Sequence, residues 1–312
     1  MERRPKDDRA AAQADDLDAR RRKIIDLARG ASLEMSAREA LATDALNELV
    51  APATTIYISF PSTGTHHELV AAAQRLARAG LTPVPHIAAR ALVGFTQLND
   101  CLVRLAGEAG VEQALVIAGD AEHPVGSFAS SQQLLETGLF EKHGIRRIGI
   151  AGYPEGHPRI SGHRLDEALK IKWGLARQRG LLLSIVTQFG FEAEPIAAWI
   201  GALNAQGIDA PVTVGLAAPA SVATLAKFAV RCGVGNSLRS LVGGHAAVAR
   251  LLVESGPERI IDRLAAAAHD GLHIAGLHFY TFGGVRRASA WLGAIARGDF
   301  TFAASGGFRV SR

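Results

Sequence analysis

Several polar side chains lie within or directly after short apolar stretches of the sequence. Glu34 is flanked by two apolar residues, Asp120 follows one apolar run and Gln188 lies near the end of another. A carboxyl group can transfer a proton or stabilise a developing cation, and an amide offers both a donor and an acceptor. Further polar residues occur at the same kind of position: Ser59, His86, Tyr153, Glu155, His157, His278 and Tyr280.

Each of these residues also has an ordinary structural explanation. Glu34 can pair with a nearby arginine, Asp120 can form a turn or cap a helix, and His86 can be a buried core histidine. Gln188 can hydrogen-bond the end of a neighbouring strand, and Tyr280 can be interior packing. We favour functional roles for the two carboxylates, because an acidic residue at the end of an apolar strand is unusual unless it points into a polar mouth.

Other common catalytic motifs are missing from the sequence. It contains no P-loop and no G-x-S-x-G elbow, and its glycine pairs at 243–244 and 283–284 do not follow the pattern of a dinucleotide fingerprint. The adjacent pair His66 and His67, and the separate His123 and His163, lack metal-ligand spacing. We therefore predict no metal site and no Rossmann nicotinamide domain.

The elements that must position the polar residues form a repeated alternation of strands and helices. Eight runs rich in aliphatic residues alternate with amphipathic stretches, and most of the runs are apolar throughout, as in parallel strands buried on both faces. We predict an α/β fold, a closed (β/α)8 TIM barrel rather than an open Rossmann sheet. The expected strands are 32–36, 55–60, 82–88, 113–119, 147–153, 182–189, 211–217 and 274–281.

The barrel carries additions at both ends and before its eighth strand. Residues 1–30 are highly charged and predict an N-terminal arm that becomes helical, 31–300 form the catalytic barrel, and 301–312 form a flexible tail. The long stretch 236–270 predicts two or three extra helices before the eighth strand.

Composition narrows the classes of function. The chain has 312 residues, with 34 basic and 30 acidic side chains for a net charge of +4, and no apolar run of membrane-spanning length. The basic run 20–23 is interleaved with aspartates, so we expect a solvated helix face rather than a nucleic-acid surface. Two cysteines, Cys101 and Cys232, are too few for a disulfide framework. We expect a cytoplasmic protein, with possible homo-oligomer contacts through the arm or the insert.

Three sequence segments carry a family resemblance. The segments AGYPEGHP at 151–158, TQF at 187–189 and LHFYT at 277–281 resemble the catalytic barrel of methylenetetrahydrofolate reductases of the bacterial type. The pair Gly119-Asp120, the pair Pro85-His86 and Glu34 fit the same order along the chain. The resemblance covers roughly residues 31–298.

The resemblance implies a FAD-dependent enzyme of one-carbon metabolism and methionine biosynthesis. Such an enzyme moves hydride between NAD(P)H, the flavin and the one-carbon bridge of a folate. Glu34 would be the general acid, with its pKa raised by burial, and Asp120 would stabilise the folate cation and contact the flavin. Folate-binding residues would be Asp120, Gln188, Phe189 and Tyr280. Cofactor-binding residues would be Ser59, His86, Gly119, Asp120, Tyr153, His157 and Lys172.

The sequence departs from the family pattern at three places. Ala118 stands where the family commonly has arginine, Val222 where it has an aromatic residue, and Phe282-Gly283-Gly284 where it tends to have a polar pair. Two alternatives therefore stay open: direct hydride transfer between NAD(P)H and folate without flavin, and a folate-binding barrel that transfers methyl groups or is not catalytic. The sequence does not distinguish the direction of the reaction, NADH from NADPH, or a polyglutamate preference.

Overall fold

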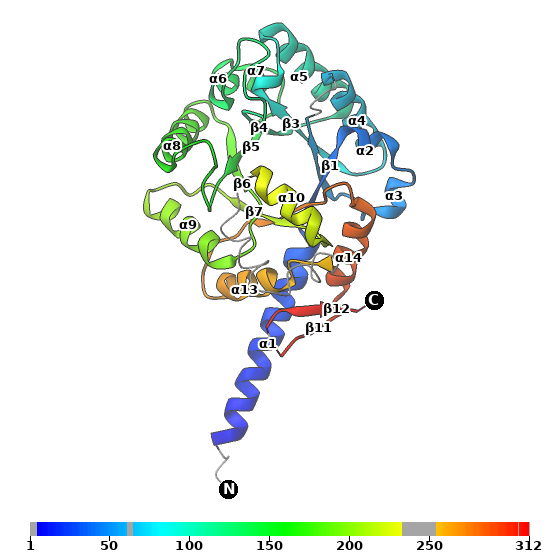
Figure 1. Cartoon of the computed structure of the whole chain (residues 1–312), viewed down its shortest axis with the longest axis vertical. Helices are drawn as coiled ribbons and strands as arrows, with labels where there is room; N and C mark the ends of the chain where they lie inside the picture. Colours follow the sequence, from blue (N-terminus) through cyan, green and yellow to red (C-terminus); the bar gives the residue numbers. More distant parts are fainter. Residues whose placement is uncertain (1–4, 61–64, 233–253, 305, 312) are drawn as a thin grey trace.

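The computed structural model describes residues 5–60, 65–232, 254–304 and 306–311. Eight parallel strands close into a barrel in the order β1-β10-β7-β6-β5-β4-β3-β2 (Figure 1). The predicted (β/α)8 barrel is confirmed, and every predicted strand is present with its ends moved by no more than two residues. The strands are β1 Ser32–Ser36, β2 Thr55–Ser59, β3 Thr82–Ala88, β4 Gln113–Ile117, β5 Arg147–Gly152, β6 Leu182–Thr187, β7 Val212–Ala217 and β10 Gly276–Tyr280.

The barrel strands are apolar on both faces because each face has its own core. Tyr57, Val84, Leu115 and Val186 meet inside the barrel, while outward-facing residues such as Ile56 pack under the surrounding helices. Fully burying an aliphatic or aromatic side chain contributes about 1.5–3 kcal/mol, so the strands and helices stabilise each other. The surrounding helices are α2 Ala37–Ala42, α3 Leu46–Leu49, α4 His66–Arg78, α5 Phe95–Ala109, α6 Ser131–Glu136, α7 Leu139–Lys142, α8 Gly162–Gln178, α9 Ala193–Ala205, α13 Glu258–His269 and α14 Val285–Arg297, with a 3-10 turn, η1, at Ala89–Ala91.

The charged N-terminal segment forms one long helix, α1 Pro5–Arg29, that projects from the barrel (Figure 1). Its last turns bury Ile24, Leu27 and Ala28, and the helix packs against α13 and α14. The expectation of a solvated basic face is wrong for two arginines of this helix. The Arg20 guanidinium pairs with the buried Asp262 at 3.0 Å, and Arg21 donates to the backbone oxygen of Phe300.

The C-terminal segment differs from the flexible tail that the sequence predicted. Strands β11 Phe300–Phe302 and β12 Phe308–Val310 form an antiparallel pair, and Phe300 and Phe308 are buried in the main core. Asp262 accepts a hydrogen bond from the backbone N–H of Gly307 at 3.0 Å, which attaches this pair to α13. The aromatic residues of the segment give it a packed position.

The region between β7 and β10 contains additional elements. Helix α10 Val222–Cys232 follows the short strand β8 Ala220–Ser221, which pairs with β9 Glu254–Ser255. Of the predicted insert 236–270, residues 236–253 lie outside the described residues, and α13 occupies most of the remainder. Among the helices that the structure describes, none combines the length and apolar character of a membrane span.

The Arg20–Asp262 pair makes the attachment of α1 testable. Arg20→Ala leaves a buried carboxylate without its cation and removes the guanidinium 4.9 Å from the centre of the Phe302 ring. We expect the free energy of unfolding to fall by about 1–3 kcal/mol, measured by denaturant titration. Arg22→Ala, at an exposed position of the same helix, is the control and should change it little. Equal unfolding midpoints for the two variants would contradict this role for Arg20.

Candidate active site

Glu34 lies in β1 between two histidines that come from β3 and β10. Its Oε2 atom is 3.6 Å from Nε2 of His86 and 3.7 Å from Nε2 of His278. Both histidines are buried, whereas 21% of the Glu34 side chain is exposed. Within the described ranges, neither Nε2 atom has a hydrogen-bond partner, and Glu34 Oε2 lies just beyond hydrogen-bond distance of both.

The orientation of His278 is fixed from its other side. Ser32 Oγ lies 2.9 Å from His278 Nδ1, and the Tyr57 ring stands edge-on to the imidazole with centroids 4.6 Å apart. When the Ser32 hydroxyl donates to Nδ1, the imidazole carries its proton on Nε2, toward Glu34. Sequence reasoning missed Ser32. The sequence did contain a sign of its role: Ser32 lies two residues before Glu34, and this spacing puts both side chains on the same face of a strand.

The two histidines reverse the expected direction of the Glu34 pKa. Burial alone raises the pKa of this carboxyl, but the interaction with His278 and the charges of His86 and His278 outweigh burial and lower it below its usual value. Burial also lowers the pKa of His86. The prediction of a raised Glu34 pKa is wrong because it considered burial without the two partners.

The Tyr280 ring stands edge-on to His278, with ring centroids 4.8 Å apart. Its hydroxyl donates to the backbone oxygen of Thr187 at 3.0 Å. A Cβ atom on Gly215 would come within 2.2 Å of that oxygen and 2.8 Å of the Tyr280 ring, so this position requires glycine. Burial raises the pKa of Tyr280 well above its usual value, and the nearby Glu34 and Tyr153 raise it further.

Asp120 lies on the rim of the same mouth. It is exposed and follows Gly119, whose φ of 90° is in the region that favours glycine. The Tyr153 ring stands edge-on to His157 with centroids 5.2 Å apart, and the pKa of Tyr153 is raised by burial and then by Asp120. Because the barrel strands are parallel, the loops after β4 and β5 lie at the same end of the barrel as Tyr280, the last residue of β10.

Two arginines that sequence reasoning missed surround the loop after β4. The Arg90 guanidinium donates to the backbone oxygens of Ala121 and Ala129, each at 3.0 Å, and Arg159 donates to the backbone oxygen of Asp120 at 3.5 Å. Arg90 lies two residues after the apolar end of β3, a signal that sequence reasoning overlooked, whereas Arg159 lies in the loop between β5 and α8. They place positive charge beside the loop in which the arginine of the family pattern is replaced.

Three other predicted site residues lie on β2, on α8 and directly after β6. Ser59 ends β2 opposite Ser36 of β1. Lys172 is buried in the middle of α8, and burial lowers its pKa to about 8. The Gln188 side chain folds back and accepts the backbone N–H of Phe189 at 3.1 Å, which leaves its amide N–H groups for other partners.

An aromatic cluster covers the strand ends beside Tyr280. Phe189 is buried among Phe191, Tyr280 and Phe282, and Phe228 of α10 stacks on Phe282 with ring centroids 4.3 Å apart. Phe282 has a φ of 52°, a left-handed conformation that costs roughly 1–2 kcal/mol in a residue other than glycine. The position that lacks the family's aromatic residue, Val222, is a buried first residue of α10.

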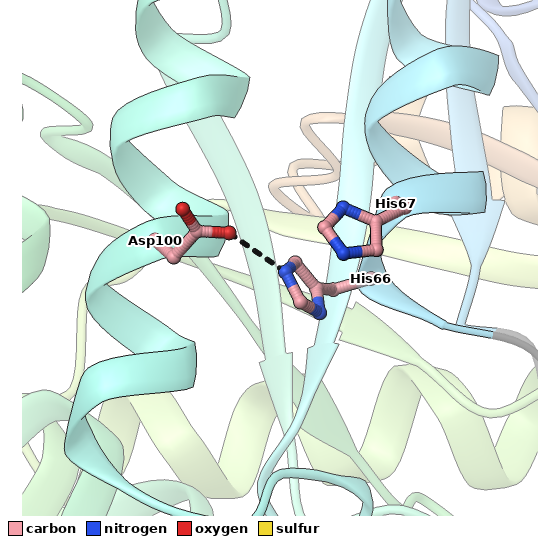
Figure 2. Close-up of side chains that lie close together, drawn as sticks. All are labelled: His66, His67 and Asp100. Atoms are coloured by element: carbon pink, nitrogen blue, oxygen red, sulfur yellow. Dashed lines mark hydrogen bonds and ion pairs between the residues drawn. The ribbon is translucent and has the colours of Figure 1, made fainter.

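A separate histidine cluster lies between α4 and α5. His66, His67 and Asp100 bring possible metal-ligand atoms within 4.8 Å of one another, and His66 Nε2 contacts Asp100 Oδ2 at 2.8 Å (Figure 2). Sequence spacing did not reveal this proximity. The Gln97 amide N–H faces His66 Nδ1 at 3.2 Å, and Arg104 contacts His67 Nδ1. Donors at both Nδ1 atoms favour protons on Nε2, so we interpret the cluster as a hydrogen-bonded connection between helices.

Comparison with known proteins identifies a family model that matches this chain. The model, described as methylenetetrahydrofolate reductase, matches residues 42–290, about four-fifths of the chain. The matched segment begins after β1, so Glu34 lies outside it. Among solved structures, a β-mannanase of Thermomonospora fusca in a mannotriose complex aligns over 59% of this chain and 68% of its own, with 10% identity and a TM-score of 0.36.

The histidine pair around Glu34 generates a direct test. His278→Asn removes the first of the interactions that lower the Glu34 pKa, so burial should dominate and the pKa should rise. Carbon-13 NMR of the glutamate side-chain carboxyls reports the titration, with Glu34→Gln to assign the signal. His273→Asn is the control, because His273 is exposed and precedes β10 at the opposite end of the barrel. An unchanged Glu34 titration in His278→Asn would rule out this electrostatic coupling.

Proposed function

The chain belongs to the methylenetetrahydrofolate reductase family, and from that premise we propose that it interconverts 5,10-methylenetetrahydrofolate and 5-methyltetrahydrofolate. In the reducing direction, a hydride and a proton are consumed as one carbon–nitrogen bond of the methylene bridge opens. NAD(P)H would be the hydride donor and FAD the cofactor that carries the electrons, and the product keeps the carbon as a methyl group. The family assignment supports an oxidoreductase of folate metabolism, and the finer assignments are our proposal.

The observation that carries the proposal is the half-buried Glu34 carboxyl between two buried histidines. Opening the methylene bridge requires a proton on a ring nitrogen, and this gives an iminium cation that accepts hydride. In the oxidising direction, an ionised Glu34 can accept the proton. In the reducing direction, a folate covering the mouth would bury Glu34 further, raise its pKa and favour proton uptake before the bridge opens.

Residues around the mouth can bind and orient the folate. Asp120 would place a negative charge near the developing cation and accept N–H groups from the pterin edge. The amide N–H groups of Gln188 would donate to the same edge, while Phe189 and Tyr280 provide an apolar wall. Tyr280 is already held by its hydrogen bond to the Thr187 backbone, which favours a fixed orientation of its ring.

The residues present fit a flavin with an anionic diphosphate. When bound, FAD supplies a two-electron carrier that exchanges hydride with both substrates. The cations that can approach its phosphates are Arg90, Arg159 and the buried Lys172, whose lowered pKa indicates a cation that a bound anion would stabilise. The arginines at the end of α8 are used elsewhere: Arg179, for example, donates to the backbone of Glu136.

The remaining cofactor assignments follow the resemblance. Ser59, His86, Gly119, Tyr153 and His157 would contact the flavin from the ends of four different strands and the loops after them. We place the reaction in the cytoplasm, where thiols outside disulfides, such as those of Cys101 and Cys232, stay reduced. A homo-oligomer assembled through α1 is compatible with its projection from the barrel (Figure 1).

The visible absorption spectrum of the purified protein tests the flavin. We expect the bands of oxidised flavin, bleached by NAD(P)H and also by 5-methyltetrahydrofolate, because the proposed reaction is reversible. A colourless protein that oxidises NAD(P)H with methylenetetrahydrofolate, without added FAD, would instead support direct hydride transfer. Folate binding without any oxidation of NAD(P)H would support a non-catalytic or methyl-transfer barrel.

Glu34→Gln tests the proton-transfer role. The amide keeps the size of the side chain but cannot supply a proton, so we expect folate turnover to fall by about 10²–10⁴-fold, while flavin reduction by NAD(P)H continues. Stopped-flow absorbance separates the two half-reactions. The control is Glu112→Gln, which changes an exposed carboxylate paired with Arg147 at the other end of the barrel. Wild-type folate turnover in Glu34→Gln would remove Glu34 from the mechanism.

A further inference from the structure

We propose that Phe282 is the surface on which a flat nitrogen heterocycle stacks, and that Phe228 of α10 occupies the place of this ligand ring in the present structure. The proposal rests on the proposed function and adds a specific binding position to it. The ligand class is a planar aromatic ring with a polar edge, which both a pterin and a nicotinamide have.

The first observation is the conformation of Phe282. Phe282 and Gly283 have φ values of 52° and 83°, and the backbone N–H of Gly284 donates to Thr281 at 2.9 Å. A turn whose two central residues both have positive φ normally contains asparagine, aspartate or glycine at those positions. A phenylalanine there is strained, and strained residues that the surrounding structure holds in place are concentrated at ligand sites.

The second observation is that this turn is attached directly to Glu34. Thr281 is buried and its hydroxyl donates to the backbone oxygen of Glu34 at 2.7 Å. At the other end of the turn, the backbone N–H of Val285 donates to the Glu39 carboxyl at 3.2 Å. The Phe282 ring is therefore held at a fixed position relative to the proposed general acid, as a stacking surface for a reacting ring requires.

The third observation concerns the ring that covers Phe282. Phe282 and Phe228 stack with centroids 4.3 Å apart and planes 27° apart, whereas Phe189 meets Phe282 edge-on at 5.5 Å. Phe228 does not belong to a barrel strand. It comes from α10, whose apolar face packs onto the aromatic cluster, while α13 is the helix that packs beside α9 in the outer ring. A ring on such an added helix can be replaced without opening the barrel.

The position of Phe282 also fits a heterocycle more than a simple hydrocarbon. The Tyr280 ring lies nearly parallel to Phe282, at 6.4 Å and 19°, and edge-on to His278 at 4.8 Å. His278 in turn faces Glu34. A planar ligand on Phe282 would have apolar rings along its face and ionisable groups near its edge.

The test compares three leucine variants, Phe282→Leu, Phe228→Leu and Phe191→Leu, in protein saturated with FAD. Dissociation constants for 5-methyltetrahydrofolate and, separately, for NADH are measured by calorimetry, and thermal melting checks the fold of each variant. We expect Phe282→Leu to weaken binding about ten-fold, equivalent to about 1.4 kcal/mol, because the stacking face is lost. Phe228→Leu should tighten binding of the same ligand several-fold because the competing ring is removed. Phe191→Leu should leave it within two-fold.

The outcomes distinguish a pterin ligand from a nicotinamide ligand, and they distinguish failure of the stacking proposal from failure of the proposed function. If Phe282→Leu weakens binding of the folate alone, the stacked ring is the pterin, and if it weakens binding of NADH alone, the stacked ring is the nicotinamide. Weaker binding of both ligands shows that they share this position. If Phe282→Leu binds both ligands with dissociation constants within two-fold of wild type, the stacking role is overturned. The proposed function would remain intact. A loss in Phe228→Leu equal to that in Phe282→Leu would also overturn it, since both rings would then act as ordinary packing. Wild-type protein that binds neither ligand would overturn both proposals.

Discussion

The closure of the barrel between β1 and β10 is the constraint on which the candidate site depends. The two strands pair with Ser32 opposite His278 and Leu33 opposite Phe279. This register brings the Ser32 hydroxyl to Nδ1 of His278 and the Glu34 carboxyl to its Nε2. It also lets the Thr281 hydroxyl donate to the backbone oxygen of Glu34. A shift by one residue would turn the side chains of β1 to the opposite face and separate these groups. The same pairing therefore closes the fold and brings together the side chains for which we propose an acid–base role.

Electrostatics at this closure explain why one charge state is favoured. A carboxyl that is merely buried becomes harder to ionise, whereas Glu34 has two imidazoles within 4 Å and its pKa is lowered. The stability that this ionised group contributes is present above the pKa of an unfolded glutamate and is lost as the pH falls through the lower pKa of the folded state. For His86, burial disfavours the charged imidazolium and so lowers its pKa. Glu34 therefore favours its ionised form, and we propose that a bound ligand exchanges a proton with it.

Most of the fold could be predicted from the sequence, since apolar runs of strand length repeat at regular intervals between amphipathic helices. Local pattern also indicated that Glu34, His86 and Tyr280 lie in barrel strands. It could not give the direction of the Glu34 pKa, which depends on the meeting of three strands. Nor could it reveal that Arg20 pairs with Asp262, or that the end of the chain packs through Phe308, because both contacts join segments distant in sequence.

Helices α10 and α13 pack in different places, and this difference explains how the strained residue Phe282 persists at the mouth of the barrel. Helix α13 packs beside α9 and α1 in the outer ring, whereas α10 packs onto the aromatic cluster. Helix α10 is then free to place Leu225, Phe228 and Ala229 over the strand ends, where they shield the rings of Phe189 and Phe282 from water. Burial of these rings offsets the unfavourable backbone of Phe282 as long as some planar group covers it. Because Thr281 attaches the same turn to the Glu34 backbone, the strained residue is held close to this strand, at the position where we propose that an aromatic ligand stacks.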